Sequence, residues 1–190
     1  KRGLNKDMSV PPGGKVSYGD DGELDGRMYD DATFLFSKII YNPSDEEFKR
    51  IYRNFMKYAA MLGITAAGEL YPTFVGKEDV YSIFKELEDE DELTLRISFA
   101  VKLLDYDTEA YQKICREYCS NKLRCYGTKD LLDGVISVHT ALMLEPYSDD
   151  PTTCGCTANP PDKIKESVLK AAADGVPVRL HCIGDGAVRM

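Results

Sequence analysis

The stretch Val176-Pro-Val-Arg-Leu-His-Cys-Ile-Gly-Asp185 decides the fold. Its short apolar run predicts a β-strand that ends at His181, with a glycine and an aspartate close behind. A strand that carries a histidine at its carboxyl end is how α/β proteins build metal and catalytic sites. The sequence stops at Met190, before a helix can pack this strand down. We therefore expect it to be cut from something larger.

Helical and strand-like segments alternate upstream of this stretch. The predicted order is a helix from Ser44 to Gly63, a strand over 64–70, a helix around 80–87, a strand over 93–101, a helix from Asp107, a strand from 123 towards 132, a long loop over 135–161, a helix over 162–173 and the final strand. Such alternation predicts parallel strands with right-handed crossovers. Four strands fit a small doubly wound sheet or half of an eight-stranded barrel.

The first helix has the clearest local signals. Ser44 is the expected N-cap, and Glu47 three residues later completes a capping box. Gly63 is expected to end the helix. Apolar residues recur at helical spacing, which predicts a buried stripe of Phe48, Ile51, Tyr52, Phe55, Met56 and Ala59. The segment 64–70 that follows is predicted to be a short buried strand.

Residues 1–35 differ from the rest in composition. Pro11-Pro12-Gly13-Gly14 and Asp21-Gly22 are turn sequences. Residues 15–18 and 27–29 are expected to pair as a hairpin around Asp21-Gly22. We interpret residues 1–35 as an irregular β arm or insertion and residues 36–190 as the main domain.

Composition narrows the classes of function. The 190 residues are 43% hydrophobic and 29% charged, which fits one globular domain. The net charge of −8 argues against a general nucleic-acid or anionic-membrane surface, and no apolar run could span a bilayer. The six cysteines are too sparse for a disulfide scaffold, so we expect reduced thiols and a cytoplasmic location. Cys154-Gly-Cys156 lacks the second pair that a structural zinc site needs.

Three groups of residues could carry chemistry. His181 is either a metal ligand or a histidine hydrogen-bonded inside a barrel mouth. Lys129 precedes Asp133, and spacing alone favours a solvated ion pair, although a buried lysine could act as a base or, once carbamylated, bridge two metals. His139 is a pocket residue or an exposed one. Gly184-Asp-Gly186 lacks the third glycine of a dinucleotide fingerprint.

Taken in order, three motifs resemble the amidohydrolase superfamily. They are Lys129-x-x-x-Asp133-Gly134, then Thr140-Ala-Leu-Met-Leu-Glu-Pro-Tyr147-Ser-Asp-Asp-Pro151, then His181-Cys-Ile-Gly-Asp185-Gly-Ala-Val188. The resemblance is to the YtcJ-like branch, which includes N-substituted formamide deformylases and proteins labelled exoenzyme regulators. It extends upstream to Gly63-Ile-Thr65 and the glycine-rich arm, and so covers nearly the whole chain.

The resemblance implies a partial metal-dependent (β/α)8 TIM barrel, about strands two to five, with the arm as a substrate-side insertion. Lys129 matches the strand-four lysine that bridges metals, carbamylated, and His181 matches the strand-five metal ligand. Asp133 and Asp185 match recurring positions with supporting roles, whereas His139 gains no role. The strand-one His-x-His, the later histidine and the strand-eight aspartate have no counterpart in this sequence.

The function expected from the resemblance is hydrolysis of an amide or related C–N bond by metal-activated water in a longer parent. One or two divalent ions, zinc by expectation, and a small-molecule amide substrate are implied. The 190 residues alone are expected to be inactive and to associate through exposed strand edges. A non-catalytic regulatory or binding protein on the same scaffold is the alternative. A free-standing domain that binds a phosphorylated ligand at Gly184–Gly186 is a third.

Overall fold

The computed structural model describes residues 8–11, 14–30, 32–33, 35, 43–70 and 80–190. The chain divides into two compact units. One unit comprises Lys1–Asn42, Leu131–Asn159 and Cys182–Met190, and the other comprises Pro43–Asp130 and Pro160–His181. Within the described ranges, no helix is long and apolar enough to cross a membrane. Pro12 and Gly13 of the predicted turn sequence lie outside the described residues.

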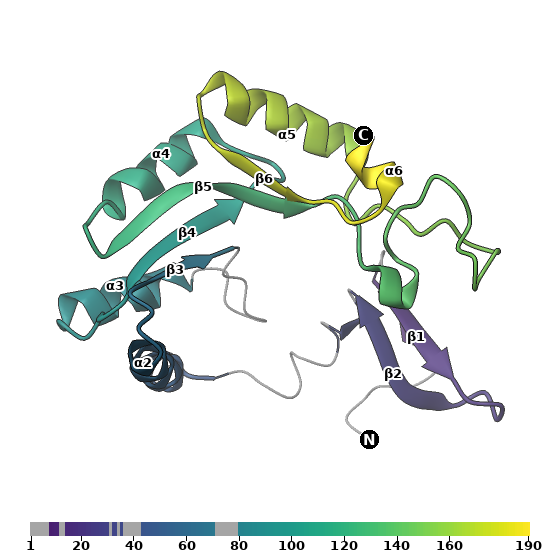
Figure 1. Cartoon of the computed structure of the whole chain (residues 1–190), viewed down its shortest axis with the longest axis horizontal. Helices are drawn as coiled ribbons and strands as arrows, with labels where there is room; N and C mark the ends of the chain where they lie inside the picture. The colour runs from purple at the N-terminus through teal and green to yellow at the C-terminus, as the bar shows by residue number, and fades with distance from the viewer. Residues whose placement is uncertain (1–7, 12–13, 31, 34, 36–42, 71–79) are drawn as a thin grey trace. The chain divides into compact units, whose positions relative to one another are not determined.

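The second unit is a parallel α/β layer. Its sheet has the strand order β3 (Ala66–Glu69), β4 (Arg96–Lys102), β5 (Leu123–Leu131) and β6 (Val178–His181). The helices α2 (Asp45–Met61), α3 (Tyr81–Asp89), α4 (Thr108–Glu117) and α5 (Pro161–Ala173) alternate with these strands (Figure 1). β3 pairs with β4, and β4 with β5, in parallel. The predicted order and the parallel pairing are confirmed.

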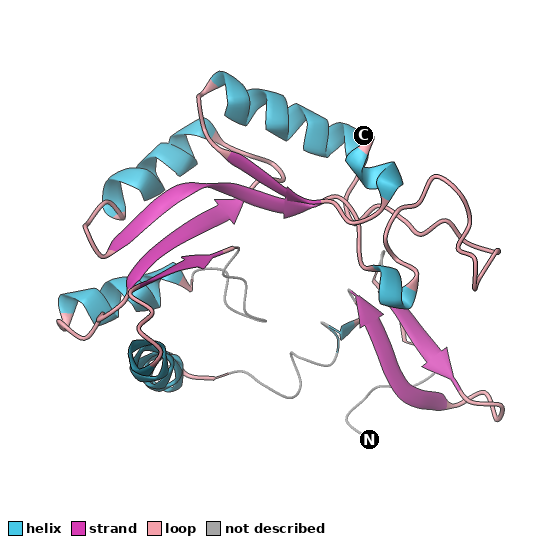
Figure 2. Ribbon diagram, in the orientation of Figure 1, coloured by secondary structure: helices cyan, strands magenta, loops and turns pink. Residues whose placement is uncertain are grey.

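All four helices cover the same face of this sheet. One core cluster joins side chains of α2 and α3 to Ile97, Phe99 and Leu123 of the strands. A second, built around Leu103, Tyr106 and Ala171, packs against Val178 and Leu180 of β6. Figure 2 shows the curled sheet with α3, α4 and α5 on its outer side. A curled parallel sheet with helices outside is consistent with part of a TIM-like barrel.

The predicted helix ends are confirmed. The Ser44 hydroxyl accepts a hydrogen bond from the Glu47 amide at 3.3 Å, as an N-cap does. Gly63 has φ +74° directly after the last helical turn, a left-handed conformation that glycine adopts without steric cost. Asp107 caps α4 by accepting from the Ala110 amide at 2.8 Å. The predicted capping box is only half formed, because the Glu47 side chain contacts Arg50 at 3.3 Å instead of accepting from the Ser44 amide.

Three details of the prediction were wrong. β3 is exposed or half-buried rather than buried, because it is an edge strand of the sheet. On α2, Ile51 and Phe55 are 36% and 45% exposed, because the core contacts the stripe of Phe48, Met56 and Ala59 instead. The final strand is followed by a helix after all, the four-residue α6 (Asp185–Val188).

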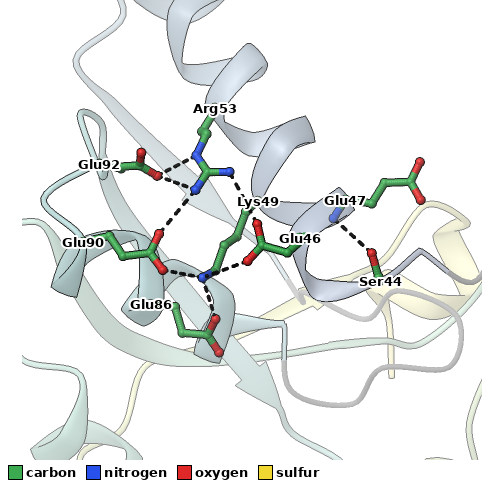
Figure 3. Close-up of polar contacts among 8 residues, drawn as sticks. All are labelled: Ser44, Glu46, Glu47, Lys49, Arg53, Glu86, Glu90 and Glu92. Carbon is green, nitrogen blue, oxygen red and sulfur yellow. Dashed lines mark hydrogen bonds and ion pairs between the residues drawn. The ribbon is translucent and has the colours of Figure 1, made fainter.

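A charge network joins α2 to the end of α3 (Figure 3). Lys49 is only 4% exposed, and its ammonium lies 2.5 Å from Glu90 and 2.9 Å from Glu86. Arg53 of the next turn contacts Glu92 at 2.5 Å. The hydrogen bond between Lys49 and Glu90 raises the pKa of the lysine and lowers the pKa of the glutamate. These ion pairs fix the two helices to each other across the chain segment that separates them.

The first unit contains the predicted hairpin. β1 (Gly14–Tyr18) pairs with β2 (Leu24–Asp30) in antiparallel register, with Lys15 opposite Tyr29. The same unit includes the predicted long loop, whose regular structure is the short helix η1 (Ile136–Val138). It also includes α6, which follows β6 along the chain.

Candidate functional site

Lys129 and His181 lie on the same face of the sheet. Val178 and Leu180 pack against the helices, so alternation along β6 directs His181 to the opposite face, which we call the inner face. On β4, Val101 packs in the helix-side core, so Lys102 lies on the inner face. Lys129 is the register partner of Lys102 and therefore shares that face. Both candidates also lie at or near the carboxyl ends of neighbouring strands.

The side chain of Lys129 is half-buried beside its own strand. Its ammonium donates to the Asp130 carbonyl at 3.1 Å. The adjacent Asp130 carboxylate faces the other way and accepts from the Leu104 amide at 2.8 Å. Thus the Asp130 carboxylate, the nearest in sequence to Lys129, hydrogen-bonds the backbone that follows β4.

Asp133 joins two separate stretches of the chain. Its side chain is fully buried, and its two oxygens accept three backbone hydrogen bonds. The donors are the amides of Leu142 at 2.9 Å, Ile183 at 2.9 Å and Gly184 at 2.7 Å. If this carboxylate bound a metal ion instead, it would lose charge-assisted hydrogen bonds from three amides. Asp133 therefore fixes the backbone that follows His181.

Gly184 makes this arrangement possible. A methyl group at its Cα would lie 1.9 Å from the Leu142 carbonyl oxygen, so a larger residue cannot occupy the position without movement. The Asp185 carboxylate accepts a further hydrogen bond, from the Leu144 amide at 2.9 Å. The Gly184-Asp-Gly186 segment thus packs against the 142–144 backbone, and its glycines are explained by close packing.

His139 forms a separate local cluster. Its Nε2 lies 3.0 Å from the Asp149 carboxylate, and its ring packs edge-on against Tyr147 at 4.6 Å. Hydrogen bonding to His139 lowers the pKa of Asp149. The Tyr147 hydroxyl donates to the Ala141 carbonyl at 2.7 Å, which anchors the cluster in the loop. His139 is 31% exposed, which fits a partly solvated loop residue.

The cysteines are free thiols, as expected. Burial raises the pKa of Cys125 to about 11, which keeps that thiol protonated at neutral pH. Within the described part of the chain, no group of three or more histidine, cysteine, aspartate or glutamate side chains could hold a metal. Cys154 and Cys156 therefore belong to no such group there.

Two inner-face residues were missed in the sequence. The predicted strand ended at Val101, one residue before Lys102. The alternation of Ile97, Phe99 and Val101 would have placed Lys102 on the inner face. Arg179, two residues before His181, was read only as part of an apolar run. Its guanidinium stacks 4.4 Å from the Tyr126 ring centroid and donates to the Tyr126 hydroxyl at 2.9 Å.

These features define a parallel α/β layer with a lysine and a histidine on one face, near the carboxyl ends of adjacent strands. The sequence profile of the amidohydrolase family matches residues 1–190, and the chain belongs to that family. The resemblance noted in the motifs is thereby confirmed.

The relatives are distant and much longer. The chain is 26% identical to Protein LONG AFTER FAR-RED 3 of Arabidopsis thaliana and 25% identical to YtcJ of Bacillus subtilis (strain 168), which is named as an amidohydrolase. The alignments cover 93% and 96% of this chain but 32% and 34% of those proteins. The chain thus spans about a third of the length of the curated relatives it matches.

Two solved structures share the fold. They are uncharacterized metal-dependent hydrolases from Pyrococcus horikoshii OT3 and Pyrococcus furiosus, each 22% identical, with TM-scores of 0.64 and 0.66. The superpositions cover 92% and 97% of this chain and 36% and 37% of those chains. At this level of identity the superpositions show a shared fold.

Proposed function

We propose that the chain is the part of a metal-dependent amidohydrolase that contains barrel strands two to five. The parent hydrolyses an amide or related C–N bond of a small molecule. The observation that carries the proposal is the shared inner face of Lys129 and His181, on adjacent strands of a chain in this family. Active sites of such barrels lie at the carboxyl ends of the strands.

The donor chemistry of these residues fits part of a metal site. A neutral imidazole such as that of His181 is a common ligand of zinc and related ions. Lys129 would serve as a carbamate, whose two oxygens can bridge two ions. Two ligands are fewer than the three or four that a protein zinc site uses. The remaining ligands are therefore supplied by parts of the parent beyond these 190 residues.

Each residue has a defined task in this proposal. A divalent ion, when bound, would supply a water of lowered pKa as the nucleophile. His181 and Lys129 hold the site on two rigid, adjacent strands. Asp133 fixes the turn after His181, and Asp185 fixes the neighbouring 144 backbone. The arm of residues 1–35 and the 135–161 loop are proposed to form the substrate side, with the arm as an insertion on the main domain of residues 36–190.

The test compares the longer protein that contains this sequence with residues 1–190 alone. Hydrolysis of a panel of small amides is measured by release of the amine. The longer protein is expected to turn over with bound metal, whereas the 190 residues are not. Tight stoichiometric zinc and turnover by the 190 residues alone would refute the proposal. A longer protein without His-x-His and a late histidine and aspartate would favour a binding function.

A further inference from the structure

Two cysteines face each other between α4 and β5. Cys115 lies near the end of α4, and Cys125 lies near the start of β5. Cys125 packs against the helix-side core, so its side chain points towards the helices. The two thiols interact directly, and both interact with the hydroxyl of Tyr111, one turn earlier in α4. These three groups form a cluster that the proposed hydrolysis does not use.

Backbone hydrogen bonds hold the end of α4 against the start of β5. The Tyr118 amide donates to the Ile114 carbonyl at 2.9 Å, and the Tyr118 carbonyl accepts from the Cys125 amide at 3.3 Å. Two hydrogen bonds therefore connect Cys125 to the turn of α4 that carries Cys115. A disulfide requires Cα atoms within roughly 7 Å of each other, so only residues that the backbone already holds as neighbours can be bridged without movement.

The third cysteine of this region, Cys119, points away from the pair. It forms an antiparallel bridge with Arg124. Bridge partners share a face, and successive residues of a strand point to opposite faces, so Cys119 and Cys125 lie on opposite sides. The Cys119 thiol donates instead to the Arg116 carbonyl at 3.3 Å. Cys115 is therefore the thiol that faces Cys125.

The two thiols differ in their surroundings. Burial raises the pKa of Cys125 to about 11, so this residue remains a thiol at neutral pH. Cys115 belongs to a helix whose side chains are all exposed or half-buried, so a small oxidant can reach it. Burial also raises the pKa of Tyr111, whose protonated hydroxyl can donate a hydrogen bond to a thiolate at Cys115. These surroundings suit Cys115 to react first and Cys125 to react second.

We propose that Cys115 and Cys125 are a redox modification site, which hydrogen peroxide converts into a disulfide between α4 and β5. The Cys115 thiolate attacks one peroxide oxygen, the O–O bond breaks, and Cys115 becomes a sulfenic acid. The Cys125 sulfur then attacks the sulfenic sulfur, and the Cys125 proton leaves with the displaced hydroxide as water. The two thiols together lose two electrons, and one hydrogen peroxide is reduced to two waters. This inference is independent of the proposed function, and it ties α4 to the strand that carries Lys129.

The test treats the longer protein that contains this sequence with hydrogen peroxide, blocks the remaining thiols and maps the cysteines by mass spectrometry of tryptic peptides. Trypsin places Cys115, Cys119 and Cys125 in separate peptides, because it cleaves after Lys113, Arg116, Lys122, Arg124 and Lys129. We expect the Cys115 and Cys125 peptides to be joined, and dithiothreitol to separate them. Hydrogen exchange of the α4 amides should slow by about tenfold on oxidation, because the cross-link restrains the opening of the helix.

Variants test the order of the two steps. In Cys125→Ser the sulfenic acid of Cys115 should persist and react with dimedone, whereas in Cys115→Ser the Cys125 thiol should stay unmodified. Cys156→Ser replaces an exposed cysteine outside the pair and should form the bridge as the native protein does. A bridge through Cys119, a sulfinic acid at Cys115 without a bridge in the native protein, or an unmodified pair at a peroxide concentration that oxidises Cys119 would overturn the inference. Dimedone labelling of Cys125 in Cys115→Ser would overturn the assignment of Cys115 as the first thiol to react.

Discussion

The Asp133 carboxylate accepts a hydrogen bond from the Gly184 amide at 2.7 Å, across 51 residues of sequence. Together with the bond from the Ile183 amide it connects the segment after β5 to the turn after β6, and a third bond, from the Leu142 amide, adds the 135–161 loop. The first two of these segments follow strands that carry proposed metal ligands. The Asp133 carboxylate therefore orders the backbone of three segments that are distant in the sequence.

Replacing Asp133 by Asn should destabilise the chain. The amide keeps one acceptor but turns an NH2 group towards backbone amides, which leaves buried donors unpaired. We expect a loss of about 3 kcal/mol in the free energy of unfolding. Hydrogen exchange should accelerate at the amides of Leu142, Ile183 and Gly184. Asp185→Asn is the control, since it affects one exposed bond. Unchanged protection of the three amides would contradict the assignment.

Gly184 should tolerate no side chain. The Cβ of alanine would meet the Leu142 carbonyl oxygen at 1.9 Å, so the two backbones must separate. We expect Gly184→Ala to cost roughly 3 kcal/mol by overpacking. Gly68→Ala is the matched control, because no atom lies within 4 Å of its added methyl group. Denaturant unfolding of both variants measures the difference. A Gly184→Ala variant as stable as Gly68→Ala would show that the packing is looser than described.

The network around Lys49 predicts how stability changes with pH. The folded pKa of Glu90 is below its ordinary value of 4.5, so its contribution is complete above that value and is lost as pH falls through the folded pKa. The pKa of Lys49 is raised, so its contribution is lost only in strong alkali. As the pH is lowered from about 5 to about 3, the melting temperature of Glu90→Gln should therefore fall less than that of the native chain. Identical pH dependence in Glu90→Gln and the control Glu166→Gln would exclude this role.

The edge of the sheet predicts self-association of the 190 residues. β3 is one of the two edge strands, and α2 before it exposes an apolar stripe of Ile51, Phe55, Tyr58 and Leu62. Exposed strand edges and apolar patches favour pairing with a second copy. We expect a dimer by light scattering, weakened by Phe55→Lys but not by Leu169→Lys, which alters an exposed leucine of α5. A monomer at all accessible concentrations would refute this prediction.

Local signals in the sequence predicted the elements well. Ser44, Gly63 and Asp107 mark helix ends through contacts within a few residues, so their roles can be read without the fold. The alternation of helices and strands likewise predicted the parallel sheet. The motif around His181 placed it at the end of a strand, where the structure has it.

Contacts between distant segments could not be predicted in this way. The bonds of Asp133 join residues up to 51 positions apart, and the sequence contains no periodic signal for them. The exposed stripe on α2 was misread because Ile51 and Phe55 have the same apolar character as the buried Phe48 and Met56. Only the packing partner decides which stripe is buried.

The metal content of the longer protein tests the central claim most directly. Metal per chain is measured by mass spectrometry for the native protein, for His181→Ala and for His139→Ala, each purified with added zinc. We predict one or two ions per native chain. His181→Ala should lose at least one of them, whereas His139→Ala should keep the native metal content. Undiminished metal in His181→Ala, or no metal in the native protein, would contradict the assignment of His181 and with it the proposed function.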